Sequence, residues 1–407
     1  MDTTHDPVRH IKYLRQSLSQ DNEAIGFFIS AGCPLAVRVP EEQWPLIPDV
    51  ARLTEYINTE LNNNEQYSRL VSELEKAGKN KNNIEDILSF LRGLLSVSKG
   101  GEVRGLTEVQ LIALERDICE KIAVKIDVIL PDMETPYHRL SKWIRSIDRK
   151  IAIEIFTTNY DLLMEQSLEQ MEIPYFDGFV GANNPFFDLR ALEDNLIPKH
   201  WSRLWKIHGS INWSQKIIGN QKRVYRTHPK NEESSHLIYP SHLKYEESRK
   251  MPYLALLDQL NRFIRKKSSF LILSGYSFND GHLNDVIVSA LKSNPTAMVL
   301  GLMFGEYYVD NTEGDDTEKN KNERYPEAYR LAKNQHNLNI WTDDAAIIGT
   351  NYGEWYGDFQ NDENKEILSF IIEKDPQKKQ FSKSNVKFGD FHEFALFLQK
   401  IIGSIRD

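Results

Sequence analysis

Four short polar segments of this chain each follow an apolar stretch and carry side chains that can bind a nucleotide or move a proton. They cover residues 30–33, 157–161, 206–209 and 274–280. A neutral imidazole such as that of His208 accepts a proton near neutral pH. A side-chain amide such as that of Asn159 donates and accepts hydrogen bonds without titrating. Together these two groups can hold a water molecule or a ribose hydroxyl and remove its proton.

Two of the segments also contain small residues suited to a close approach of the backbone to a ligand. Ser30, Ala31 and Gly32 form one turn, and Gly275 and Ser277 belong to another. Small residues let backbone amides reach a pyrophosphate without a side-chain collision. Each segment also has a purely structural explanation, because ordinary turns and helix caps use the same residue types.

Strands are needed to bring these distant segments together. The apolar run 24–29 stops at Ser30, and three further strand-like stretches, 151–156, 204–207 and 269–273, lead into the other three segments. Stretches with helical spacing alternate with these strands, which predicts an α/β fold with a Rossmann-like, doubly wound, mostly parallel sheet. In such sheets ligands bind beyond the carboxyl ends of the strands. All four segments fall at predicted strand ends.

The spacing of apolar residues and the composition of the rest of the chain predict an organisation in three parts. Residues 51–130 show only helical spacing, which indicates a large helical insertion. Residues 373–390 are rich in Lys, Gln and Ser and are expected to be a flexible surface loop, and 391–405 has the pattern of an amphipathic helix. The expected parts are a catalytic domain at 1–50 and 131–350, a helical insertion at 51–130, and a partly flexible C-terminal appendage at 351–407 that ends in a C-terminal helix.

Composition excludes several classes of protein. The 407 residues carry a net charge of −9, which argues against direct nucleic-acid binding. The sequence has no apolar run of about 20 residues and its N-terminus lacks a secretory signal, so we expect no membrane span and a cytoplasmic location. Cys33 and Cys119 are the only cysteines, so neither a disulfide framework nor a four-cysteine zinc site is expected.

Taken in order, the four segments resemble the sirtuin family. Ser30–Gly32 resembles its Gly-Ala-Gly turn, with Ser30 as the departure, and Thr158–Asp161 resembles its Gln-Asn-Ile-Asp segment. His208–Gly209 is similar to the family's catalytic histidine, and Gly275–Ser277 to its Gly-Thr-Ser turn. The resemblance implies NAD as substrate and Asn159 and His208 as catalytic residues. It implies NAD-binding roles for Ser30, Ala31, Gly32, Cys33, Thr158, Tyr160, Asp161, Gly275, Ser277 and Asn279.

The absence of a cysteine-based zinc motif narrows the resemblance to one group of sirtuin-like proteins. Sirtuin deacylases carry a zinc ribbon of two Cys-x-x-Cys pairs, and this sequence has no such pairs. The chain therefore looks more like the bacterial sirtuin-like NAD hydrolases of anti-phage defence, which deplete NAD. Its general organisation resembles the subunits encoded beside a HerA-type ATPase. Because an uncontrolled NAD hydrolase would kill its host, we expect activity to depend on assembly into a homo-oligomer or on such a partner. The expected activity is release of nicotinamide and ADP-ribose, with no metal. The alternatives are a non-catalytic subunit that senses NAD or ADP-ribose, and an NAD-dependent deacylase or ADP-ribosyltransferase.

Overall fold

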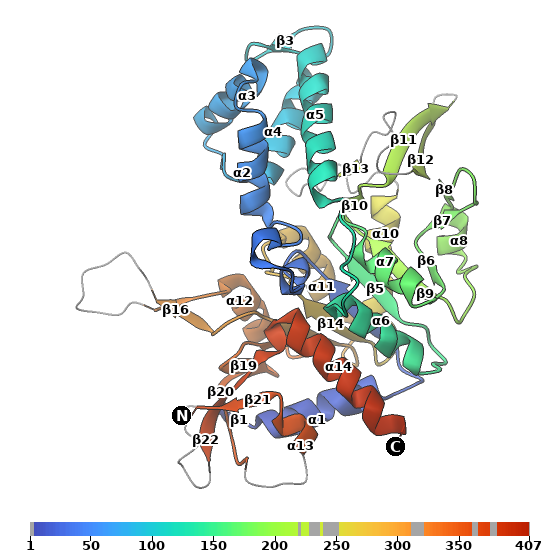
Figure 1. Cartoon of the computed structure of the whole chain (residues 1–407), viewed down its shortest axis with the longest axis vertical. Coiled ribbons are helices and arrows are strands. Elements are labelled where there is room, and N and C mark those ends of the chain that lie inside the picture. The colour runs from blue at the N-terminus through green and yellow to red at the C-terminus, as the bar shows by residue number, and fades with distance from the viewer. Residues whose placement is uncertain are drawn as a thin grey trace, which may run out of the picture.

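A large central sheet organises the chain (Figure 1). The computed structural model describes residues 4–218, 221–227, 237–238, 252–310, 321–359, 365–374 and 381–406. Within these residues the central sheet has 12 strands. They are β1 (Thr4–His5), β2 (Ile25–Ile29), β5 (Glu154–Thr157), β6 (Tyr175–Phe176), β9 (Ser202–Lys206), β14 (Phe270–Ser274), β15 (Met298–Leu302), β18 (Leu338–Trp341), β19 (Ala345–Ile348), β20 (Asn351–Gly357), β21 (Ile371–Glu373) and β22 (Ser382–Val386).

The order of these strands is that of a doubly wound sheet. Strands β6-β9-β5-β2-β14-β15-β18 lie side by side and run parallel. Without the edge strand β6, their chain order reads 3-2-1-4-5-6, as in dinucleotide-binding folds. Strands β19, β20, β22 and β21 extend the sheet in antiparallel pairs. The predicted fold class, an α/β fold with a mostly parallel Rossmann-like sheet, is confirmed.

Helices cover both faces of the sheet because successive strand residues point to opposite sides. Phe27 packs in the core on one face and Phe28 in the core on the other. The first core includes side chains of α1 (Pro7–Leu18), α6 (Pro136–Ser146), α7 (Leu163–Gln170) and α14 (Phe391–Arg406). The second includes those of α10 (Tyr253–Ile264), α11 (Gly281–Ser293) and α12 (Pro326–Asn334). No helix among the described residues has both the length and the apolar character to cross a membrane.

A group of helices, which we call the helical unit, stands out from the α/β body (Figure 1). It comprises α2 (Val50–Glu60), α3 (Glu65–Lys76), α4 (Ile84–Val97) and α5 (Glu108–Ile126). Each helix begins after a capping residue, Asp49, Asn64, Asn83 or Thr107, whose side chain accepts a backbone N–H of the first turn. The buried Leu and Ile side chains of the unit join the first core of the sheet.

Shorter elements complete the described chain. They are η1 (Cys33–Ala36), η2 (Glu41–Gln43), β3 (Glu102–Val103), β4 (Leu106–Thr107), β7 (Phe179–Val180), β8 (Phe186–Phe187), α8 (Leu189–Glu193), β10 (Gly209–Ser210), β11 (Trp213–Ile218), β12 (Gln221–Arg226), β13 (Leu237–Ile238), β16 (Tyr308–Asp310), β17 (Lys321–Glu323), α13 (Lys365–Leu368) and η5 (Lys387–Gly389). Strands β11, β12, β8 and β7 form a separate antiparallel sheet beside the main one.

The C-terminal region differs from its predicted flexible loop. Of the stretch 373–390, residues 375–380 lie outside the described part of the chain. Residues 382–386 were expected to belong to a loop, but they form strand β22, which pairs with β20 and β21. Ser382 and Ser384 are buried while Lys383 is exposed, so the strand alternates in burial although its inward side chains are polar. Helix α14 packs against α6 and adds Phe394 and Leu398 to the core.

Two glycines let the turns after β2 and β14 touch. Gly275 has φ +68°, and a Cβ there would lie 2.6 Å from the Cys33 nitrogen and 2.9 Å from the Gly32 nitrogen. A Cβ on Gly32 would lie 2.8 Å from the Gly275 Cα. The close approach of the two turns therefore requires glycine on both sides.

Gly275→Ala should lower the free energy of unfolding by about 2 kcal/mol or more. A left-handed alanine costs about 1–2 kcal/mol, and the collision with the 32–33 backbone adds an overpacking cost. Gly93→Ala is the matched control, because Gly93 lies within α4 with open space around it and alanine favours a helix by about 0.5–1 kcal/mol. Urea unfolding of the two variants measures both effects. Equal stability of Gly275→Ala and the parent would contradict the close packing of these turns.

Candidate active site

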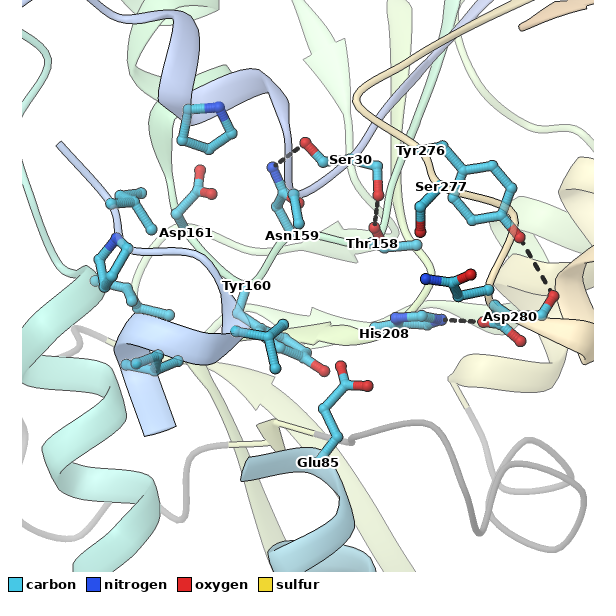
Figure 2. A pocket seen from close by; sticks show the side chains of 18 of the residues that line it. Ser30, Glu85, Thr158, Asn159, Tyr160, Asp161, His208, Tyr276, Ser277 and Asp280 are labelled. Atoms are coloured by element: carbon cyan, nitrogen blue, oxygen red, sulfur yellow. Dashed lines mark hydrogen bonds and ion pairs between the residues drawn. The ribbon is translucent and has the colours of Figure 1, made fainter. Parts of the chain in front are cut away.

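The four polar segments meet at one edge of the sheet because their strands are adjacent and in register. Ser274 of β14 pairs with Ile29 of β2, Ile29 with Thr157 of β5, and Thr157 with Lys206 of β9. The residues that follow each strand therefore emerge at the same level. They surround a cavity of about 420 Å³ (Figure 2), within the size range of small-molecule sites.

Most of the residues predicted for the site line this cavity. The nine that do so are Ser30, Ala31, Thr158, Asn159, Tyr160, Asp161, His208, Ser277 and Asn279. The other three, Gly32, Cys33 and Gly275, do not line it and form the contact between the two turns behind it. The Cys33 thiol is fully buried and donates to the Ser274 carbonyl oxygen at 3.2 Å. Burial raises its pKa to about 12, so the thiol stays protonated and is a structural group.

The two turns differ in the backbone amides they offer to a phosphate. The amides of Ser30, Gly32 and Cys33 already donate to carbonyl oxygens of Ser274, Gly275 and Ser30. By contrast, no acceptor in the described part of the protein engages the amides of residues 276–279. The latter turn precedes α11 and contains Phe278 at φ 60°. A run of unengaged amides in such a turn is an anion-binding arrangement, so phosphate binding is expected mainly at residues 276–279.

Hydrogen bonds between neighbouring strand ends hold Asn159 in place. Its side-chain nitrogen donates to the Ser30 carbonyl oxygen at 3.3 Å, and its backbone amide donates to Thr157 Oγ1 at 3.0 Å. The Ser30 and Thr158 hydroxyls are 2.7 Å apart (Figure 2). The first turn thus orients the Asn159 side chain, whose amide has further capacity to bind a ligand or water.

His208 lies across the cavity from Asn159 and faces an acidic group (Figure 2). Its Nε2 atom is 3.4 Å from Oδ2 of Asp280, and both side chains are nearly buried, with 13% and 11% exposed. Asp280 is also the N-cap of α11, where its Oδ1 atom accepts from the amides of His282 and Leu283. Asp is a common N-cap residue, but nothing in the sequence marks the contact of Asp280 with His208.

Asp161 is a buried carboxylate in the wall of the cavity. Its Oδ1 atom accepts the Leu163 amide at 2.9 Å, and its carbonyl oxygen accepts Nζ of Lys206. Lys206 is itself buried and pairs with Oε1 of Glu165 at 2.8 Å. Burial raises the pKa of Asp161 to about 6, although the positive charge of Lys206 opposes this rise. Burial of a carboxylate costs free energy, so a buried carboxylate with a raised pKa is expected where a ligand needs its charge or its proton.

Asp161→Asn should stabilise the protein at neutral pH. Because the folded-state pKa of Asp161 lies above its unfolded value, the folded protein holds more protons between about pH 4 and pH 6. The contribution of this carboxyl group to stability is therefore lost as pH rises through 6. Asparagine keeps a side-chain oxygen that accepts the Leu163 amide but has no carboxyl group to ionise. We therefore expect the free energy of unfolding to rise by about 1–2 kcal/mol at pH 8.

The gain from Asp161→Asn should vanish near pH 4, where the parent carboxyl is protonated. Thermal unfolding of both proteins from pH 4 to pH 8 measures the difference. The control is Asp188→Asn, the same substitution at the N-cap of α8, outside the cavity. A gain that is constant across this range would contradict the assigned role of burial.

The helical unit supplies a further wall that the sequence did not associate with the site. Asn83 and Glu85 come from the start of α4, and Glu85 points toward Tyr160 and His208 (Figure 2). Periodicity shows that a helix exists but not where its end lies in space, so no sequence signal marked these residues. The cavity-lining residues that were not predicted are Pro34, Ile47, Pro48, Val50, Leu53, Asn83, Glu85, Ile126, Tyr276 and Asp280.

The charged side chains that line the cavity are mostly acidic. They are Glu85, Asp161 and Asp280, together with His208, and none of the described lining residues is Lys or Arg. Within the described chain, no group of three or more His, Cys, Asp or Glu is arranged to hold a metal ion. The cavity therefore favours a cationic or neutral group near His208, with anionic groups held by backbone amides.

Comparison with known proteins agrees with this geometry. Residues 153–332 match the family model of the SIR2-like domain. The matched range runs from β5 to α12 and contains three of the four strand-end segments, while the turn after β2 and the helical unit lie outside it. No curated protein is similar enough to the chain to count as a match. The matched region supports a sirtuin-like domain, which indicates a function related to NAD.

Proposed function

We propose that this SIR2-like protein is an NAD hydrolase that releases nicotinamide and ADP-ribose. The observation that carries the proposal is the placement of Asn159 and His208 in one cavity at the carboxyl ends of adjacent strands. A group that orients water and a group that takes its proton are the two that hydrolysis of a glycosidic bond to nicotinamide requires. The unengaged amides of 276–279 supply a complementary place for the pyrophosphate.

In the proposed reaction, the bond between the ribose C1′ and the nicotinamide nitrogen breaks. The bonding electron pair stays with nicotinamide and neutralises its ring, while positive charge develops on the ribose. Asn159 holds the water that attacks C1′, and His208 accepts its proton and passes it to solvent. Asp161 binds the carboxamide of the leaving nicotinamide. The products are nicotinamide, ADP-ribose and one proton.

The acidic lining supports this assignment electrostatically. Nicotinamide enters the site with a positive ring, and the charge moves to the ribose in the transition state. Fixed carboxylates near that charge, such as Glu85 and Asp161, stabilise it electrostatically. The same carboxylates disfavour a bound anionic product, which assists release of ADP-ribose.

Water is the proposed acceptor because the helical unit walls the cavity on the side of Asn83 and Glu85. The chain has only two cysteines, both buried, so a cysteine-based zinc ribbon is not part of its acceptor site. A small acceptor fits such a site better than an acyl-lysine peptide does.

The test is product analysis after incubation of the purified protein with NAD, with and without an acetyl-lysine peptide. The proposal predicts equal amounts of nicotinamide and ADP-ribose, unchanged by the peptide. Release that requires the peptide and yields acyl-ADP-ribose would identify a deacylase instead. NAD binding measured by calorimetry, with no release under any condition, would identify a nucleotide-sensing subunit.

We further propose that the hydrolase acts in the cytoplasm as an NAD-depleting effector of anti-phage defence. We propose a homo-oligomer that works with a HerA-type ATPase, because unrestrained NAD hydrolysis would harm the host cell. The proposal is supported by the resemblance of the four segments to the sirtuin family. It is also supported by exposed apolar side chains of the helical unit, among them Val109, Ile112 and Val124.

Cellular NAD measured during phage infection should fall with the parent gene and not with His208→Ala. Unchanged NAD in both cases would contradict the defence role.

A further inference from the structure

We propose that Asp280 is a positioning residue that holds the imidazole of His208 through Nε2 and stabilises its protonated form. The contact joins His208, in the turn after β9, to Asp280, the N-cap residue of α11 after β14. Strands β5 and β2 lie between β9 and β14 in the sheet. Only the effect on catalytic rate rests on the proposed hydrolase function. The orientation and protonation of His208 can be measured without any reaction.

The Asp280 carboxylate is fixed independently of His208. Its Oδ1 atom accepts two amides, from His282 at 3.1 Å and Leu283 at 3.2 Å. The backbone carbonyl oxygen of Asp280 accepts the Asn284 backbone amide at 3.0 Å and lies 3.3 Å from the Tyr276 hydroxyl. The N-terminus of α11 also stabilises its negative charge. These contacts hold the carboxylate in place beside the imidazole.

A second set of hydrogen bonds makes this turn rigid. The Tyr276 hydroxyl donates to Oδ1 of Asn284 at 2.8 Å, and the Asn284 side-chain nitrogen donates to the Phe278 carbonyl oxygen at 2.7 Å. Asn284 is buried, with 3% of its surface exposed. The turn that carries the unengaged amides of 276–279 is thus one unit with Asp280. A ligand phosphate bound to those amides would sit on the same rigid segment that holds His208.

The chemical consequence concerns the two nitrogens of His208. With Nε2–H directed at Asp280 Oδ2, Nδ1 carries the lone pair and serves as the base. When Nδ1 takes a proton, the imidazolium forms beside a carboxylate at 3.4 Å in a nearly buried site, where the attraction is strong. The other titratable groups lining the cavity are Asp161 and Tyr160 from the turn after β5, Glu85 from α4, and Tyr276 from the turn after β14.

The decisive variant is Asp280→Asn, which keeps a good N-cap for α11 but removes the charge. Asp6→Asn is the matched control, because Asp6 caps α1 by accepting two amides in the same way and does not line the cavity. We expect the midpoint of His208 protonation, followed by NMR, to move to lower pH in Asp280→Asn and not in Asp6→Asn. We also expect kcat for NAD cleavage to fall about tenfold or more with KM little changed, since a displaced base loses most of its contribution.

A measurement on the parent protein removes any dependence on variant folding. The ¹⁵N shifts of His208 in the neutral form should report a proton on Nε2. A proton on Nδ1, or a protonation midpoint that is the same in Asp280→Asn and Asp6→Asn, would show that Asp280 is only a helix cap. If the midpoint shifts but no NAD cleavage occurs in the parent, the positioning role stands and the hydrolase function fails.

Discussion

His208→Ala should reduce the rate of nicotinamide release by about a hundredfold or more, and Asn159→Ala should do the same. A positioned acid or base contributes about 10²–10⁴-fold, and both side chains line the cavity where the strand ends meet. The losses should appear in kcat rather than in KM, because these groups act on the water and not on the bulk of the dinucleotide. Nicotinamide release at saturating NAD measures both effects.

The matched controls for these two variants are His336→Ala and Asn334→Ala. Both residues are exposed near the end of α12 and do not line the cavity, so their removal should leave release unchanged. The double variant of Asn159 and His208 should be little worse than either single variant, because the two groups act on one water molecule. Full turnover by Asn159→Ala or His208→Ala would refute the assigned roles.

Lys206→Met should lower the free energy of unfolding by about 3–5 kcal/mol, the range for breaking one partner out of a buried ion pair. Lys206 is almost completely buried, with Nζ 2.8 Å from Oε1 of Glu165 and a second contact to the Asp161 carbonyl oxygen. Removal of the lysine leaves the Glu165 carboxylate buried without its cation. Urea unfolding followed by circular dichroism measures the loss.

The double variant Lys206→Met, Glu165→Leu should recover most of that loss, because it removes the stranded charge together with its partner. Lys76→Met is the surface control, since the Lys76 side chain is 65% exposed and its pair with Glu73 should contribute little. If Lys206→Met were as stable as Lys76→Met, the buried pair of Lys206 and Glu165 would not contribute the stability assigned to it.

The sequence was sufficient for the four strands that carry the site because apolar runs are local signals. The run that ends at Ser30 and the three similar stretches predicted parallel strands whose ends share an edge, and the register of β14, β2, β5 and β9 has that form. Strand β22 was missed for a physical reason. Its buried positions are Ser382 and Ser384 as well as Val386. Burial therefore alternates along the strand, but apolar and polar residues do not alternate in the sequence.

The site was only partly predictable because some of its contacts depend on tertiary placement. Asp280 could be recognised as a helix cap from its local context, but its distance to His208 depends on the order of the strands β9, β5, β2 and β14 in the sheet. Glu85 reaches the cavity because the start of α4 lies beside the strand ends. The engaged amide of Gly32 likewise follows from the contact with Gly275, which no turn pattern indicates.

The central claim is that water at Asn159 and His208 replaces nicotinamide on the ribose of NAD. The most direct measurement is NAD cleavage in ¹⁸O-labelled water, with mass spectrometry of the products and His208→Ala alongside. The account predicts one nicotinamide for each ADP-ribose, one ¹⁸O atom incorporated at the ribose, and no such product with the variant. Bound NAD that stays intact with the parent protein, or ADP-ribose formed equally well by His208→Ala, would contradict it.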